Sequence, residues 1–121
     1  PYTEEWDNSL LFQIHYDVLP GSIISRFIVK MHTYILRETY WRNGILLKNK
    51  DNQTEALVLA DSTERKIFIK VRKDVLNARQ KFLEFIRSNF REIHESISNL
   101  GASEYVPVPK TNAVVSYEDL L

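Results

Sequence analysis

The chain is 121 residues long, the usual size of one domain, and its 16 Lys and Arg residues balance 16 Asp and Glu residues, which disfavours a dedicated binder of nucleic-acid backbones. It has no cysteine, so a disulfide scaffold, a thiolate metal site and a cysteine nucleophile are excluded, and we expect a cytoplasmic protein. No apolar stretch approaches the roughly 20 residues of a membrane span, residues 1–7 are too polar for a signal peptide, and the first residue is Pro1 rather than Met, which predicts a piece of a longer protein.

The first half of the sequence predicts a strand, a helix and two further strands. Residues 10–16 alternate between apolar and polar side chains, which is typical of a half-buried strand. Pro20 and Gly21 end this strand, Ser22 is placed to cap a helix, and apolar residues then recur at helical spacing to about Arg37. Residues 40–48 and 55–60 predict strands joined by the polar turn at residues 49–53.

The second half predicts one more strand, a long helix and an extended tail. Residues 66–72 alternate strictly, which indicates a strand. From Asp74, which is placed to cap a helix, the apolar residues form a helical stripe that ends near Leu100, and Gly101 stands where the residue after a helix is expected. Two prolines keep the following tail extended, and Val114 and Val115 predict an added edge strand.

These elements predict an α+β fold with the order β-α-β-β-β-α. We expect a mostly antiparallel four-stranded sheet with two helices on one face and an extended C-terminal tail. Residues 1–101 are predicted to form a single domain, and residues 102–121 a tail or linker.

No catalytic or cofactor-binding pattern is present in the sequence. Its three glycines do not form a phosphate-binding loop, its three histidines are isolated, and no nucleophile–base or paired-carboxylate pattern stands out. We therefore expect this chain not to be an enzyme and to hold no cofactor or metal ion.

One face of the predicted sheet is a candidate interface. The strand at residues 55–60 is apolar on both faces, which is typical of a strand buried on both sides, yet two helices can cover only one. We expect the other face to be covered by another domain or subunit rather than by the tail. Phe68 lies near the centre of this predicted interface, with Leu57, Leu59, Lys66 and Lys70 around it.

The strand that contains Phe68 also allows a different function. An aromatic side chain between two lysines can stack a base, so Phe68, Lys66 and Lys70 also fit a module that binds single-stranded nucleic acid. The zero net charge and the missing second aromatic residue disfavour this alternative.

Three blocks of sequence resemble the COR domain, the region C-terminal of the Roc GTPase in Roco proteins. Residues 19–29 (LPGSIISRFIV) are similar to a loop-to-helix block of that family, and residues 40–47 (YWRNGILL) to one of its strands. Residues 56–58 with 65–71 resemble the hairpin that comes next in the family. The tail, residues 104–109 with 115–121, resembles the segment that follows this domain in bacterial Roco proteins. One departure is Arg72-Lys73-Asp74, where the family often places a glycine.

The resemblance implies the C-terminal half of a COR region from a leucine-rich-repeat Roco protein. It further implies a signalling and dimerisation module coupled to the nucleotide cycle of an upstream Roc domain, which alone would hold GTP or GDP and Mg²⁺. The implied partners are a second copy of the chain and the upstream Roc and COR domains, with no membrane. Within the similar blocks we expect structural anchors at the Pro20–Gly21 corner, Arg26 and Trp41.

Overall fold

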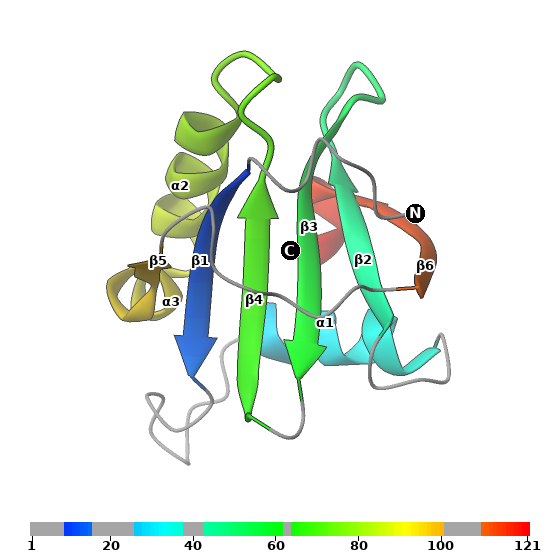
Figure 1. The fold of residues 1–121 in the computed structure, drawn as a ribbon, viewed down its shortest axis with the longest axis vertical. Coiled ribbons are helices and arrows are strands. Elements are labelled where there is room, and N and C mark those ends of the chain that lie inside the picture. The colour runs from blue at the N-terminus through cyan, green and yellow to red at the C-terminus, as the bar shows by residue number, and fades with distance from the viewer. Residues whose placement is uncertain (1–8, 16–25, 38–42, 62–63, 101–109) are drawn as a thin grey trace.

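The computed structural model describes residues 9–15, 26–37, 43–61, 64–100 and 110–121. This part of the chain forms an α+β fold of strands, α-helices and one 3-10 helix (Figure 1), which confirms the predicted class. In chain order the elements are β1 (Leu10–His15), α1 (Arg26–Arg37), β2 (Asn43–Lys48), β3 (Thr54–Asp61), β4 (Lys66–Val71), α2 (Ala78–Asn89), α3 (Arg91–Ser96), β5 (Ser98–Leu100), β6 (Lys110–Ser116) and the 3-10 helix η3 (Tyr117–Leu120).

The described strands belong to one mixed sheet with the order β5-β1-β4-β3-β2-β6. The four central strands, β1, β4, β3 and β2, pair antiparallel, and they are the four strands that the sequence predicts. The sheet is nevertheless six-stranded rather than four-stranded, because β5 pairs antiparallel with β1 at one edge and β6 pairs parallel with β2 at the other.

The helices cover one face of this sheet and enclose the main core. Alternation in the strands sends every second side chain toward the helices, including Phe12 and Ile69, while α1 and α2 contribute Phe27 and Phe82. The rings of Phe12 and Phe82 stack with 6.1 Å between their centroids. Burial of each such side chain contributes about 1.5–3 kcal/mol, so the contact between the two layers is the main source of stability. In the described residues no helix is long and apolar enough to cross a bilayer.

The long helix predicted to end near Leu100 is instead two helices and a short strand. α2 ends at Asn89, and Phe90 has φ −141° and ψ 65°, outside the helical region, before α3 begins at Arg91. The break brings the Phe90 ring within 5.3 Å of the Phe27 ring and 5.8 Å of the Phe85 ring, measured between centroids. The apolar stripe correctly predicted that Phe82, Ile86, Phe90 and Ile93 are buried. It did not predict the break, because the apolar spacing continues unchanged across Phe90.

The start of this segment also differs from the prediction. Asp74 does not cap α2; its carboxylate forms a bidentate pair with the Arg72 guanidinium, with 2.8 Å between Arg72 Nε and Asp74 Oδ1. The residue before the helix is Asn77, in the left-handed conformation with φ 61°. Leu76, which the sequence places on the buried stripe, is 81% exposed.

The described part of the C-terminal tail belongs to the domain. The predicted edge strand at Val114 and Val115 is confirmed as part of β6. η3 follows with a capping box, in which the Ser116 hydroxyl accepts from the Asp119 N–H and the Asp119 carboxylate from the Ser116 N–H. Leu120 is fully buried in the main core. Residues 110–120, which the sequence assigns to a tail or linker, therefore pack on the sheet, where β6 pairs with β2 and Leu120 enters the main core.

Gly44 in β2 allows β3 to approach closely. A Cβ atom at this position would lie 2.5 Å from Leu59 Cδ2 and closer still to the Val58 carbonyl oxygen. The carbonyl belongs to the paired strand and cannot move without disturbing the β2–β3 ladder. Glycine is thus required here by close approach rather than by an unusual backbone angle.

We expect Gly44→Ala to destabilise the fold by about 1–3 kcal/mol, because the added methyl group overlaps the β3 backbone. Urea denaturation monitored by circular dichroism measures this change. Ser88→Ala, on the exposed side of α2, is the control and should stay within about 0.5 kcal/mol of the native chain. A Gly44→Ala variant as stable as that control would contradict the close approach.

A pair of adjacent leucines tests whether the tail belongs to the core. Leu120 is fully buried, whereas Leu121 is 48% exposed. Leu120→Ala should lower the free energy of unfolding by about 2–5 kcal/mol, and Leu121→Ala by about 0.5 kcal/mol or less. Equal effects of the two substitutions in urea denaturation would show that η3 does not pack as described.

Candidate functional site

Three of the predicted interface residues form a second apolar cluster on the sheet face opposite the helices. Leu57, Leu59 and Phe68 join Leu11 there. Their side chains are buried within the single chain: Leu57 is 1%, Leu59 4% and Phe68 5% exposed. These residues therefore do not form the open patch from which the interface is predicted. An interface role for these residues stays a prediction without support from their exposure.

The two lysines beside Phe68 do not form an open basic strip. Lys70 is 2% exposed, and the Lys66 ammonium lies 4.0 Å from the Glu64 carboxylate. Base stacking requires an accessible aromatic face, and the Phe68 ring offers none in the single chain. The burial of Phe68 and Lys70 therefore contradicts the nucleic-acid alternative.

Of the predicted structural anchors, only Arg26 lies among the described residues, while Pro20, Gly21 and Trp41 lie outside them. Arg26 is the first residue of α1 and is exposed, so its role as a structural anchor stays a prediction. Its guanidinium carbon lies 5.7 Å from the centroid of the Phe90 ring. Arg26 thus makes a cation–π contact at the surface, across the break between α2 and α3.

A polar cluster around the buried Glu55, which the sequence did not predict, lies at the start of β3. It consists of Glu55, Asn49, Lys81 and Tyr117, and we call it the Glu55 cluster. The pairing of β2 with β3 shifts at this point, since Leu47 pairs with Ala56 but Lys48 pairs with Thr54. Glu55 is the extra residue of this β-bulge. The bulge interrupts alternation, so that the Glu55 side chain reaches α2 on the helix side of the sheet.

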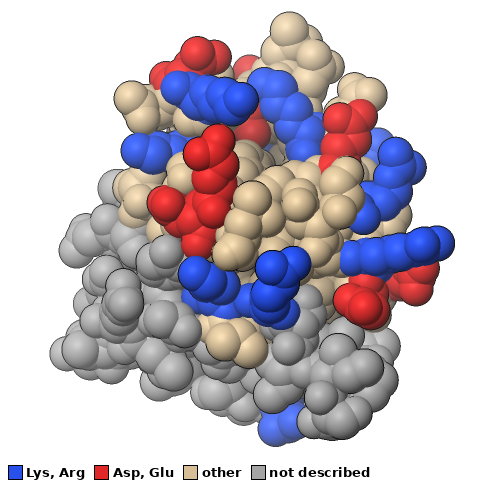
Figure 2. All heavy atoms as spheres, turned by 180° about the vertical axis from the view of Figure 1, so that it is seen from behind, with Lys and Arg blue, Asp and Glu red and all other residues tan. Residues whose placement is uncertain are grey.

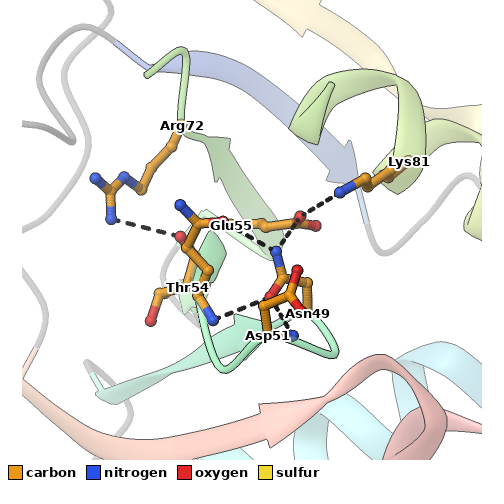
Figure 3. Close-up of polar contacts among 7 residues, drawn as sticks. Asn49, Asp51, Thr54, Glu55, Arg72 and Lys81 are labelled. Atoms are coloured by element: carbon orange, nitrogen blue, oxygen red, sulfur yellow. Dashed lines mark hydrogen bonds and ion pairs between the residues drawn. The ribbon is translucent and has the colours of Figure 1, made fainter. Parts of the chain in front are cut away.

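The Glu55 carboxylate joins two elements that are distant in sequence (Figure 3). Glu55 is fully buried, and its Oε2 accepts a hydrogen bond of 2.9 Å from Asn49 Nδ2 and lies 3.4 Å from Lys81 Nζ on α2. The Asn49 side chain also shapes the β2–β3 turn, because its Oδ1 accepts from the backbone N–H groups of Asp51 and Gln53. The turn and α2 are therefore tied to the same carboxylate.

Tyr117 of η3 completes the cluster. Its ring packs against Phe85 of α2, with 5.0 Å between centroids. Among the described residues, neither the Tyr117 hydroxyl nor Glu55 Oε1 makes a hydrogen bond within the usual geometry. Burial raises the pKa of Tyr117 far above its ordinary value of 10.0, and the negative charge of the nearby Glu55 raises it further. The phenol therefore stays neutral.

A groove of about 830 Å³ lies beside this cluster, between the β2–β3 turn, α2 and η3. A phenol held neutral is a poor general base, and the described residues contain no group of three His, Asp or Glu side chains that could hold a metal ion. This geometry favours a clamp between three elements over a catalytic role. Figure 2 shows that acidic and basic side chains are interspersed over this helix-covered face, around a patch of uncharged atoms.

A single sequence signal was available for the Glu55 cluster. Glu55 is a charged residue directly before the apolar run 56–60, at the end of the strand that is buried on both faces. Strict alternation from Leu57 and Leu59 would place the Glu55 side chain on the face of the sheet that points away from the helices. Only the register of β2 and β3 reveals the bulge that reverses this direction.

The comparisons with known proteins identify one family. A family model described as "C-terminal of Roc, COR-B domain" matches residues 7–121. No curated protein and no solved structure gives a significant match to the chain.

The pKa of Tyr117 predicts a loss of stability at alkaline pH. Above pH 10.0 the unfolded chain releases this proton while the folded chain retains it, so stability falls with rising pH by up to about 1.4 kcal/mol per pH unit. Tyr117→Phe should remove this contribution, which urea denaturation at successive pH values above 10.0 measures. Glu55→Gln should retain most of it, because burial is the larger cause. Identical pH dependence of the native chain and Tyr117→Phe would refute the assignment.

Proposed function

Because the chain belongs to the COR-B family, the domain C-terminal of Roc, we propose that it is a non-catalytic regulatory module of a Roc GTPase. In this proposal the module associates with a second copy of itself, and its association is coupled to the nucleotide cycle of the Roc domain. GTP or GDP and Mg²⁺ bind in that Roc domain.

The observation that carries this proposal is the extent of the family match. It runs over residues 7–121 and so includes every described element, from β1 to η3. The edge strand β6 and the buried Leu120 are therefore parts of the family domain rather than a linker. The absence of a phosphate-binding loop from the sequence fits a domain that is accessory to the GTPase.

The edge of the sheet at β6 supports self-association better than the face around Phe68. In the described sheet β6 is an outermost strand, paired on one side with β2. Val114 in this strand is 51% exposed, whereas the second apolar cluster is buried. Outer strands can pair with a strand from another chain and continue the sheet. We therefore place the proposed contact between two copies at β6.

Sedimentation velocity tests the proposal on a longer chain that includes the upstream Roc domain. We expect this chain to form dimers whose fraction changes between the GDP-bound and GTP-analogue-bound states. A chain that is strictly monomeric in both nucleotide states would disprove the self-association.

Two valines of similar exposure locate the contact. Val114→Asp in β6 should reduce the dimer fraction, because a charge would be placed within the proposed strand pair. Val29→Asp on α1, where the native valine is 48% exposed, should leave it unchanged. If both variants dimerise like the native chain, the contact does not lie at β6.

A further inference from the structure

A second hollow lies at the opposite side of α2 from the Glu55 cluster. This cleft of about 640 Å³ is bordered by the loop after β4, by α2 and by α3. Its lining includes Lys73 from the loop and Arg79 and Arg87 from α2. All three side chains are exposed. We call this feature the α2 cleft.

Most of the positive charge of the α2 cleft is unpaired in the described part of the chain. Arg72 of the lining pairs with Asp74, and outside the cleft Lys81 pairs with Glu55 and Arg91 with Glu95. Lys73, Arg79 and Arg87 form no such pair among the described residues, and Glu84 is the one acidic residue in the lining. The whole sequence has no net charge, so this excess reflects a local separation of charge rather than a basic protein.

An exposed leucine, Leu76, lies in the loop between Lys73 and the start of α2. The Leu76 side chain is 81% exposed, whereas the nearby Val75 and Ala78 are buried, with exposed fractions of 4% and 1%. The Ala78 N–H donates to the Val75 carbonyl oxygen at 3.1 Å, and the neighbouring Arg72–Asp74 pair also ties the loop. These contacts fix the loop on both sides of Leu76. A large apolar side chain fixed at the surface gains stability when a partner covers it.

We propose that the α2 cleft binds a protein segment that carries acidic side chains and one large apolar side chain. Carboxylates of the segment pair with Arg79 and Arg87, which can each bind a carboxylate through two parallel N–H groups. The apolar side chain of the segment packs on Leu76. This contact is separate from the proposed pairing at β6, because the cleft involves neither β6 nor Val114.

The geometry of α2 specifies the spacing of the acidic residues. Arg79 and Arg87 are eight positions apart in one helix, so their Cα atoms are separated by about 12 Å along its axis. An extended segment covers this distance in about four residues. The preferred ligand is therefore an extended peptide with two acidic residues about four positions apart. A leucine follows on the outer side of the acidic residue that lies nearer Leu76. A nucleic acid supplies negative charge but no aliphatic side chain for Leu76, and is disfavoured for that reason.

Fluorescence anisotropy with labelled peptides tests this proposal on the 121-residue chain. The probe is a peptide of about 12 residues made of Ser and Gly, with two Glu residues and one Leu at the stated spacing. A second peptide has Ser in place of the Leu, and a single-stranded oligonucleotide of similar charge is the third probe. We expect the leucine-containing peptide to bind with higher affinity than the other two probes, and more weakly as the salt concentration rises.

Variants of the chain separate the α2 cleft from general charge effects. Arg79→Glu combined with Arg87→Glu should weaken peptide binding at least about tenfold, and Leu76→Ser should abolish the preference for the leucine-containing peptide. Arg91→Glu combined with Lys50→Glu reverses two exposed charges outside the lining; this matched control should change the dissociation constant by less than about twofold. Circular dichroism verifies that each variant is folded. Lack of binding, equal binding of all three probes, or equal effects of the cleft and control variants would overturn the proposal.

Discussion

The bulge at Glu55 is the constraint on which the arrangement of the helix layer depends. One additional residue in β3 turns a carboxylate toward the helices, where Asn49 and Lys81 bind it and Tyr117 lies nearby. A charge in this position costs free energy unless polar groups surround it, so the β2–β3 turn, α2 and η3 must meet at one place. Apolar packing supplies most of the stability, but it is less directional than this cluster. The polar contacts therefore fix where the ends of these elements lie relative to one another.

Much of the sheet could be predicted from the sequence, because side chains alternate between the two faces of a strand and their apolar pattern indicates which face is buried. The central strands and the burial of Leu57 and Leu59 on the second face follow from their residues. The break at Phe90 could not be predicted in the same way. Phe82, Ile86, Phe90 and Ile93 are all buried and continue one apolar stripe, although the backbone leaves the helix at Phe90. β5 has only three residues, too few to show a period.

The sites were less predictable than the fold because they depend on exceptions to periodicity. Glu55 points toward the helices through a bulge that leaves no pattern in the sequence. Leu76 is apolar and belongs to the helical stripe by spacing, yet the left-handed Asn77 separates it from α2. For the residues around Phe68, the burial could be predicted but the covering residues could not. Their double-sided burial was predicted correctly, but the residues that cover a sheet face cannot be identified from the strand itself.

The parallel pairing of β2 with β6 has a consequence for the order in which the fold forms. Antiparallel neighbours such as β3 and β4 are joined by short turns and can pair as soon as both have been synthesised. Asn43 of β2 must instead wait for Lys110 of β6, and more than half of the 121-residue chain lies between them. On the ribosome the sheet edge and the pocket for Leu120 thus stay open until β6 and η3 have left the exit tunnel. The pairing of β2 with β6 is therefore one of the late, non-local steps of folding, and a nascent chain that has not completed it still exposes part of its core to chaperones.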